Sequence, residues 1–363
     1  MNQIPFVLLG LGPVSKTLIM QLLQMHASIM QRTGVQFVPV GIVDSSGLMM
    51  DRNGIEESML RKILRDTDGV RKLASVADLL PHERLVDIVR PGTIIVDGAH
   101  SLKTVPVVKA ALNVGAGVVM ANKIPLSIEW SKAQIFFEHP LIRYDATVGA
   151  GLPIISTLRY LQDTGDEITR IEASVSGTLG FICTALELGI PYSVAVQNAK
   201  NLGYTEPDPR DDLSGFDILR KAVILARTAG WPLEIHQLIS EAMYPPSLTT
   251  GSIEEFMTAL PSLDELYAAQ VRLAQSEGKS MRYIAYITPK GGRVGLMSVE
   301  REGYSAAKSG PANSVAIYSH RYAEMPLVIS GPGAGPEVKV GGVIEDMLQI
   351  AAVMQSKEAM VSR

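Results

Sequence analysis

The chain has 363 residues, of which 47% are hydrophobic and 19% are charged, and its formal net charge is -4. This length predicts about two domains, and the composition is that of a globular protein with ample material for a core. The absence of Lys or Arg runs argues against binding to nucleic acid or to an anionic membrane. No apolar stretch of about 18 residues occurs, and no basic leader precedes the first apolar run. We therefore expect a cytoplasmic protein.

The single cysteine, Cys183, lies in the apolar run FICTAL. One cysteine cannot form an internal disulfide, which fits a reducing compartment. We interpret Cys183 as a buried and inert residue rather than as a nucleophile.

A glycine turn near the N-terminus follows an apolar run at residues 4–9 and precedes apolar residues at helical spacing. This order of strand, turn and helix is typical of a dinucleotide-binding unit. Gly10 permits the tight turn, and Gly12 lets the backbone approach a pyrophosphate. The helix N-terminus, with Pro13 and Val14 in its first turn, offers free N–H groups to the phosphates.

Two features qualify this interpretation. Ser15 replaces the third glycine of the usual fingerprint, and a two-glycine turn is also common in other loops.

A second apolar strand, predicted over residues 35–43, ends at Asp44, where an acid favours NAD by binding the adenine ribose. Arg52 is an alternative partner for the 2'-phosphate of NADP, and Asp44 is otherwise a turn residue of the DSSG cluster, so the cofactor preference stays open.

Further strands are predicted over residues 93–97, 118–120 and 141–144, alternating with helical patterns over residues 103–112 and 127–137. This alternation predicts an α/β fold with a Rossmann-type doubly wound parallel sheet, in which ligands bind at the carboxyl ends of the strands. The loops at these ends are residues 97–101, which include Ala99 and His100, residues 121–125, which include Asn122 and Lys123, and residues 145–153.

A second domain follows, with a strand pattern over residues 168–176, a helix over 263–275 and strand patterns over 281–288 and 293–299. These patterns predict an α+β domain with a mixed sheet. We expect residues 1–150 to form an NAD(P)-binding domain and residues 151–330 to form this second domain. Residues 331–363, with Gly335 just before an apolar-periodic helix, are predicted to form a C-terminal helical segment.

The segment from Gly203 to Lys221, GYTEPDPRDDLSGFDILRK, is too polar for a hydrophobic core. Its prolines and glycines predict an ordered loop through Ser214, followed by a helix. Asp217 and Lys221, at positions i and i+4, then project from neighbouring turns of one helix face. Such a pair is either a solvated surface pair or part of a polar site, and the pattern alone does not decide between them.

This segment resembles the substrate-binding signature of the homoserine dehydrogenase family, a GYxExDPxxDLxG loop followed by a helix with Asp and then Lys. The segments VMANKIPLS, SGTLGFI and DATVGAGLP also resemble elements of that family. The resemblance covers nearly the whole chain. It implies reversible NAD(P)H-dependent reduction of L-aspartate 4-semialdehyde to L-homoserine, by a short form of the enzyme that has neither an aspartate kinase segment nor an ACT domain.

The resemblance also implies roles for residues at the matching positions. Lys221 is the acid/base, and Lys123 is its electrostatic partner at the reacting oxygen. Glu206 and Asp217 bind the substrate ammonium, and Asp212 supports the lysines. The remaining matching positions are Thr178, Gly177 and Tyr204 for substrate, and Asn122, Ala99, His100 and Gly335 near the cofactor.

The DATVGAGLP loop resembles the family loop that holds a monovalent cation, Na+ or K+, through a carboxylate and backbone carbonyls. The matching positions are Asp145, Val148, Ala150 and Leu152. Asp145 stands where the family usually has Glu, and its side chain is one methylene shorter.

The resemblance implies that residues 151–330 bind a small-molecule substrate and form a homodimer. It also implies that the C-terminal helix within residues 331–363 returns to the first domain. Two other functions remain possible on the sequence. A related semialdehyde or amino-acid dehydrogenase is compatible with Asp145 and with His100, which occupies a position where the family commonly has a small hydroxyl residue. A non-catalytic dinucleotide-binding homologue is compatible with Ser15 and with Lys339, which lies in an EVKV segment where the family often has EVTA. Retention of the site lysines and acids argues against this alternative.

Overall fold

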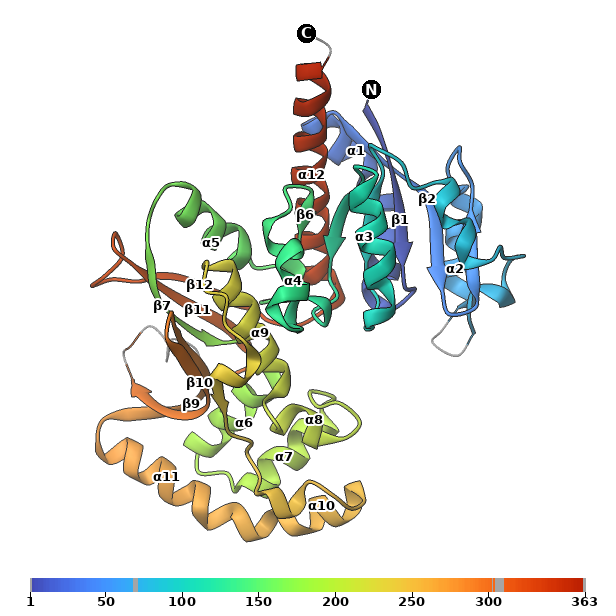
Figure 1. Ribbon diagram of the computed structural model, residues 1–363. Coiled ribbons are helices and arrows are strands. Elements are labelled where there is room, and N and C mark those ends of the chain that lie inside the picture. Colours follow the sequence, from blue (N-terminus) through green and yellow to red (C-terminus); the bar gives the residue numbers. More distant parts are fainter. Residues whose placement is uncertain (1, 68–70, 302, 304–309, 362–363) are drawn as a thin grey trace. The chain divides into compact units, whose positions relative to one another are not determined.

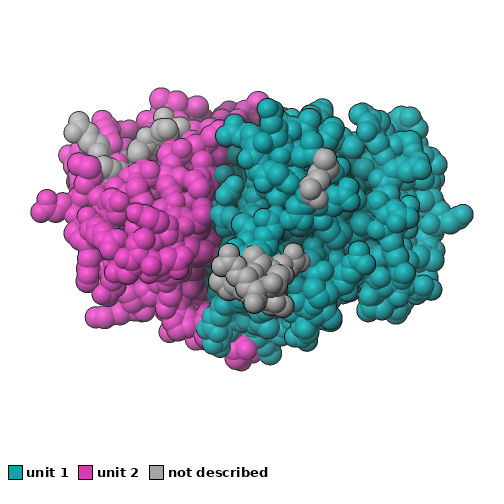
Figure 2. Space-filling view, turned by 90° about the horizontal axis from the view of Figure 1, so that it is seen from above, with its two compact units in different colours: residues 1–126, 132–151, 335–363 teal, residues 127–131, 152–334 magenta. Residues whose placement is uncertain are grey.

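The computed structural model describes residues 2–67, 71–301, 303 and 310–361. The chain divides into two compact units, which Figure 2 shows in different colours. The first unit consists of residues 1–126, 132–151 and 335–363, and the second consists of residues 127–131 and 152–334. Residues 127–131, expected from the sequence in the nucleotide-binding domain, thus cluster with the second unit. The functions assigned to the two domains stay predictions.

A mostly parallel sheet forms the centre of the first unit (Figure 1). Its strands are β1 (Asn2–Leu9), β2 (Val35–Asp44), β3 (Gly47–Met50), β4 (Ile94–Asp97), β5 (Gly117–Met120) and β6 (Ile142–Arg143). They lie in the order β3-β2-β1-β4-β5-β6, with only β3 running antiparallel to its neighbour among the strands described. Every residue of β4 and β5 is buried, as expected for parallel strands covered on both faces. The predicted parallel sheet is confirmed.

Helices cover this sheet. They are α1 (Pro13–Thr33), α2 (Glu57–Asp66), α3 (Val105–Asn113), α12 (Pro336–Val361) and most of α4 (Trp130–Glu138). Helix α12 packs against α1 and against β4, β5 and β6, so the end of the chain does return to the first unit (Figure 1). Its buried residues Val340, Val343, Met347 and Ile350 recur at helical spacing.

The second unit is built on a mixed sheet. Its strands are β7 (Ile168–Ser174), β8 (Leu238–Ser240), β9 (Lys279–Thr288), β10 (Gly291–Glu300), β11 (Ala312–Ser319) and β12 (Leu327–Pro332). The order is β12-β11-β7-β9-β10-β8, in which β8 is parallel to β10 and the other pairs are antiparallel. The mixed sheet that the sequence predicted is confirmed, although β8, β11 and β12 were not anticipated.

The helices of the second unit are α5 (Ile154–Asp163), α6 (Gly177–Glu187), α7 (Tyr192–Asn201), α8 (Pro209–Leu213), α9 (Phe216–Thr228), α10 (Ile253–Ala259) and α11 (Asp264–Ser276). Helices α6, α9 and α11 pack on β9. Cys183 on α6 is fully buried there, and burial raises the pKa of its thiol to about 12, which confirms that it lies inside the core. Among the described residues, no helix is long and apolar enough to cross a membrane.

The prediction of a loop through Ser214 was wrong, because helix α8 occupies residues 209–213. The carboxylate of Asp208 accepts a hydrogen bond from the Arg210 amide (3.0 Å), and Pro209 is the first helical residue. A capping aspartate followed by proline at the first position is a helix start signal. Asp208 and Pro209 therefore begin a short helix in a segment that was expected to be a loop.

Gly215 joins α8 to α9 and has a φ of 70°. A side chain at this position would overlap the hydroxyl of Tyr283, which donates to the Glu241 carbonyl (2.7 Å). Glycine therefore serves both the backbone conformation and the close packing of the helix start on β9.

We predict that Gly215→Ala lowers the free energy of unfolding more than Gly203→Ala does. Gly203 has a φ of 73°, but no heavy atom among the residues that the structure describes lies within 4 Å of its added side chain. Both variants incur backbone strain of about 1–2 kcal/mol, and only Gly215→Ala adds a steric overlap that costs roughly 1–3 kcal/mol. Urea unfolding of the two variants measures the difference, and equal losses would contradict the packing argument.

Candidate active site

The glycine turn connects β1 to α1. Gly10 has a φ of 89°, its amide donates to the Val43 carbonyl (2.8 Å), and a side chain on it would press against the backbone of Ala99. Gly12 is the N-cap residue of α1 and Pro13 is the first helical residue. No heavy atom of the described residues lies within 4 Å of an added side chain at Gly12, and the first turn of α1 contains no acidic residue. Free N–H groups and the positive end of the helix dipole at such an open position fit a phosphate.

Ser15 occupies the position of the third glycine in the fingerprint, whose usual function is to allow close packing of helix and strand. Its side chain is buried, and its hydroxyl oxygen lies 2.7 Å from where a side chain on Gly98 would begin. The missing side chain at position 98 therefore provides the space that Ser15 fills. This departure from the fingerprint is compatible with an intact turn.

A buried aspartate connects the loops that follow β4 and β5. Asp97 accepts hydrogen bonds from the Ala99 amide (3.1 Å), the Thr104 hydroxyl (2.7 Å) and the Asn122 side-chain amide (3.1 Å). Burial raises the pKa of the Asp97 carboxyl, and these three hydrogen bonds oppose that shift. From the sequence, Asp97 was expected only to be the first residue of the loop that follows β4. An acid at the end of a wholly apolar strand was the signal for this buried role.

Asn122 holds the backbone of the loop that carries Lys123. Its side-chain amide also donates to the Ser101 carbonyl (2.7 Å), and its side-chain oxygen accepts from the Ile124 amide (3.2 Å). Asn122 is 1% exposed, whereas His100 is exposed on the neighbouring loop. The contacts of Asn122 and His100 with a nicotinamide stay predictions, but the structure gives Asn122 a positioning function in the first unit.

Asp44 closes the turn between β2 and β3. Its carboxylate accepts hydrogen bonds from the amide (2.7 Å) and hydroxyl (2.5 Å) of Ser46 and from the Leu73 amide (2.9 Å). The turn interpretation is therefore realised, and contact with a ribose stays a prediction. Strand β3 carries the chain back along β2, so the residue before Arg52 bonds the Val40 carbonyl (3.0 Å). Arg52 lies roughly 13 Å from the Asp44 end of β2, which argues against it as the partner of a 2'-phosphate.

In the second unit, helix α9 presents the predicted acid/base. The Lys221 ammonium donates to the Val175 carbonyl (2.6 Å) and forms an ion pair with Asp217 (2.9 Å). The Lys221 side chain is 14% exposed and that of Asp217 is 45% exposed. This pair is therefore not an ordinary solvated pair, because its lysine is mostly buried and bonds the backbone that follows β7. The spacing that the sequence predicted, at i and i+4, is confirmed.

A second set of contacts fixes the acidic segment on α6. The Thr178 hydroxyl lies 2.6 Å from the Tyr204 carbonyl and 3.0 Å from the Asp212 carboxylate, and the Glu206 amide donates to Asp212 (2.7 Å). Gly177 begins α6, whose N-cap Ser176 accepts from the Leu179 amide (3.2 Å). Thr178 and Asp212 thus hold Glu206 in place.

Three carboxyl groups gather in this part of the second unit. Burial raises the pKa of Asp212 most, and the nearby charges of Glu206 and Asp217 raise it further, whereas hydrogen bonds from the Glu206 amide and the Thr178 hydroxyl lower it. Nearby carboxylates repel one another, and a bound cation would relieve this repulsion. The second unit therefore places Lys221, Asp217, Asp212 and Glu206 near one another, and the roles assigned to them stay predictions.

The predicted cation loop contains an unusual backbone. Gly149 and Ala150 have φ values of 79° and 59°, and the Asp145 amide donates to the buried Asp346 carboxylate on α12 (2.8 Å). The Leu152 carbonyl accepts the Ile154 amide (2.7 Å). Among the described residues, no group of three His, Cys, Asp or Glu side chains could hold a metal ion. Cation binding by backbone carbonyls stays a prediction.

Gly335 lies just before α12 and has a φ of 105°, and in the described part of the chain no heavy atom lies within 4 Å of an added side chain. Its carbonyl accepts the Lys339 amide (3.2 Å), so it caps the helix start. This open position is compatible with the predicted approach to a cofactor, and that contact stays a prediction.

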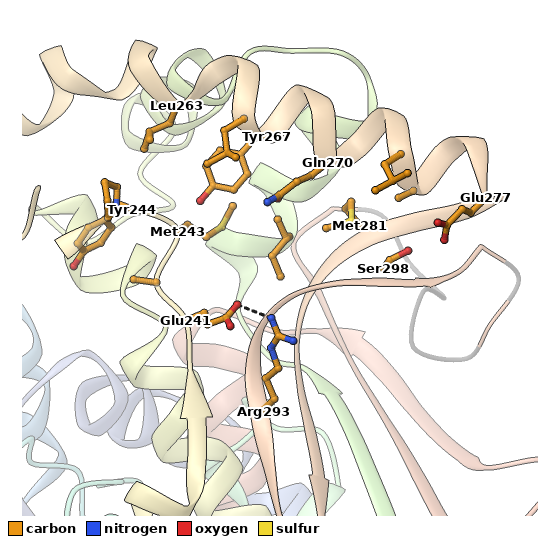
Figure 3. Close-up of a pocket in the computed structure, with 16 residues that line it drawn as sticks. Glu241, Met243, Tyr244, Leu263, Tyr267, Gln270, Glu277, Met281, Arg293 and Ser298 are labelled. Carbon is orange, nitrogen blue, oxygen red and sulfur yellow. Dashed lines mark hydrogen bonds and ion pairs between the residues drawn. The ribbon is translucent and has the colours of Figure 1, made fainter. Parts of the chain in front are cut away.

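A separate cleft of about 540 Å³ lies in the second unit between α11 and strands β9 and β10 (Figure 3). Tyr267, Gln270 and Met281 line it, and the ion pair between Glu241 and Arg293 (2.7 Å) lies at one end. None of the predicted site residues contributes to it. The cleft is therefore distinct from the site of Lys221.

The first unit has the doubly wound architecture of dinucleotide-binding proteins, and the second carries a lysine among acids. The family model for homoserine dehydrogenase matches residues 153–348. A homoserine dehydrogenase of Emericella nidulans is 39% identical over 257 residues, which cover 66% of this chain and 70% of that protein. The chain belongs to the homoserine dehydrogenase family.

Some relatives are larger proteins. The bifunctional aspartokinase/homoserine dehydrogenase 2 of Zea mays is 36% identical over 358 residues, or 96% of this chain, and the chain spans only 38% of the length of that relative.

Two solved structures match this chain over nearly their whole length. A crystal structure of a Candida auris protein of unknown function has a TM-score of 0.86 and 30% identity, and the match covers 98% of this chain and 99% of that protein. A hyperthermophilic archaeal homoserine dehydrogenase in complex with NADPH shares the fold, with a TM-score of 0.70, 22% identity and coverage of 97% and 98%.

We predict that Asp97→Asn changes the pH dependence of stability. Because the folded pKa of Asp97 is raised, its contribution is largest below the unfolded pKa near 3.8 and is lost as pH rises through the folded pKa. Asparagine does not titrate there, so the stability advantage of wild type over the variant should shrink from about pH 4.5 to pH 7. Urea unfolding of both proteins across this range measures it, and a constant or widening gap would contradict the assignment.

Proposed function

We propose that this protein is a homoserine dehydrogenase, which interconverts L-homoserine and L-aspartate 4-semialdehyde with NAD(P) as the cofactor. In the direction of reduction, the aldehyde carbon gains a hydride and the aldehyde oxygen gains a proton. A bound NAD(P)H supplies the hydride. The residues of this chain bind the substrate, orient it and supply the proton.

The observation that carries this proposal is the mostly buried Lys221 ammonium, held by the Val175 carbonyl and the Asp217 carboxylate. An ammonium has three N–H donors. Among the described residues, the two contacts leave one donor to bond a substrate oxygen. We assign Lys221 to donate its proton to the alkoxide that develops at this oxygen, and to accept the hydroxyl proton in the reverse direction.

The acids beside Lys221 support an amino-acid substrate. Glu206 and Asp217 supply negative charge for the substrate ammonium, and Asp212 fixes Glu206 through its backbone amide. A carboxylate is matched to an ammonium by charge-assisted hydrogen bonds, which are about twice as strong as neutral ones. Glu206 and Asp217 therefore serve to orient the substrate and Asp212 to position them.

Lys123 is assigned as the second cation at the reacting oxygen, where it stabilises the developing negative charge. Its loop is fixed by Asn122 and Asp97 in the first unit. The turn at Gly10 and Gly12 fits the pyrophosphate of the cofactor. A monovalent cation at the loop of Asp145 and a homodimer formed through the second unit complete the proposal, and both rest on the family resemblance.

The direct test is incubation of purified protein with L-homoserine and either NAD+ or NADP+, in sodium and in potassium buffers. We expect homoserine-dependent formation of reduced nicotinamide, followed by its absorbance, and the ratio of the two rates gives the cofactor preference. Cofactor binding without turnover of homoserine would contradict the proposed substrate and favour a related dehydrogenase or a non-catalytic protein.

We predict that Lys221→Ala lowers kcat at least tenfold, because positioned proton transfer contributes about 100-fold to 10,000-fold. Lys221→Arg should lower kcat as well, since a guanidinium keeps the charge but does not release its proton near neutral pH. Steady-state kinetics at saturating homoserine measures both variants.

The matched control is Lys62→Ala. Lys62 also donates to a backbone carbonyl, that of Val76 (2.8 Å), but it lies outside the proposed site. This control should keep the wild-type kcat. A Lys221→Ala variant with more than a tenth of wild-type turnover would overturn the assignment of Lys221.

A further inference from the structure

A short segment of the chain, residues 127–131, belongs to the second unit although the residues on either side belong to the first. We call it the connecting segment. It begins four residues after Lys123 and includes Trp130, the first residue of α4. Because the chain enters and leaves this segment within a few residues, noncovalent contacts must hold it in the second unit.

An arginine and a glutamate make these contacts. Arg227 on α9 donates to the Ile128 carbonyl (2.7 Å), to the Leu233 carbonyl (3.0 Å) and to the Glu234 carboxylate (3.1 Å). The other oxygen of Glu234 accepts the Trp130 amide (2.8 Å). Two points of the connecting segment are therefore bonded to one ion pair.

Arg227 is buried, so its guanidinium depends on these contacts. The Arg227 side chain has no exposed surface, and its guanidinium lies 5.5 Å from the centre of the Trp130 ring. A buried arginine requires hydrogen-bond partners at its several N–H groups. Glu234 also places a carboxylate at the start of α4, where free N–H groups and the helix dipole favour negative charge.

The location of Arg227 connects the pair to the proposed chemistry. Arg227 lies six residues after Lys221 on the same helix. Lys123 lies five residues before Ile128, and five extended residues span at most about 17 Å. The contact of Arg227 with Ile128 thus ties the loop of one assigned lysine to the helix of the other through a short length of chain.

We propose that Arg227 and Glu234 are positioning residues that hold the connecting segment on α9 and thereby restrict where Lys123 can lie relative to Lys221. They touch neither substrate nor cofactor. This proposal rests on the proposed function, because it concerns the relative position of the two lysines assigned to that reaction. A displacement of about 1 Å in a catalytic group can cost about 100-fold in rate.

The test uses Glu234→Gln in the full chain, because removal of Arg227 would also remove the hydrogen bonds to the Ile128 and Leu233 carbonyls. The amide oxygen of glutamine still accepts the Trp130 amide, but its NH₂ group cannot accept from Arg227. We expect kcat to fall about tenfold or more, with the KM for homoserine changed less than about twofold. The assay is homoserine oxidation at saturating cofactor.

Glu187→Gln is a closely matched control. Glu187 accepts a backbone amide, that of Met281 (3.1 Å), and forms a half-buried ion pair with Arg282 (2.6 Å) in the same unit. Neither partner belongs to the connecting segment. This variant should lose comparable stability while keeping the wild-type kcat.

Tryptophan fluorescence gives a readout that a merely structural role would not move. The chain has two tryptophans, Trp130 and Trp231, so a Trp231→Phe background leaves Trp130 as the single reporter. Acrylamide quenching of Trp130 should increase at least about twofold in Glu234→Gln and stay unchanged in Glu187→Gln. Increased quenching with unchanged kcat would overturn the positioning role, and so would a lower kcat with unchanged quenching.

The failure of this inference and the failure of the proposed function are distinguishable. If the wild-type protein does not oxidise homoserine, the proposed function is contradicted, and so is the role of Arg227 and Glu234 in that reaction. An active wild-type protein whose Glu234→Gln variant is equally active contradicts only the positioning role.

Discussion

The bonds of Lys221 to the Val175 carbonyl and the Asp217 carboxylate are the interaction on which the proposed site depends. A mostly buried ammonium must be bonded, and these two partners come from the residue that follows β7 and from the preceding turn of α9. The start of α9 is in turn fixed by Gly215 against Tyr283. The position of one charged atom therefore follows from a glycine turn, a strand end and an acid at helical spacing.

The two units differ in the charge that they are prepared to bind. In the first, the open glycine turn and the N-terminus of α1 favour phosphate, and the buried Asp97 keeps the neighbouring loops in place. In the second, Glu206, Asp212 and Asp217 favour a cation. An oxidoreductase that transfers a hydride between a dinucleotide and an amino acid must bind both phosphate and ammonium groups. The presence of one site for each charge is the physical basis of the proposed function.

Sequence patterns predicted the features that depend on local order. The glycine turn, the apolar strands and the spacing of Asp217 and Lys221 are all properties of contiguous residues. The sequence did not predict that Asp208 and Pro209 start a helix, because the same residues also favour turns. It also missed the roles of Asp97 and of Arg227 with Glu234, because their partners Asn122, Ile128 and Trp130 lie 25 to 104 residues away along the chain. Ser15 shows the same limit, because the space for its side chain depends on Gly98, which follows β4.

The most direct test of the central claim is the fate of the hydrogen on the carbinol carbon of homoserine. Homoserine carrying deuterium at that carbon should transfer one deuterium to the nicotinamide for each molecule oxidised, as measured by mass spectrometry of the reduced cofactor. Stoichiometric transfer, lost in Lys221→Ala, is the result that our account predicts. Reduced cofactor without deuterium, or no reduction by homoserine with either nucleotide, would contradict it.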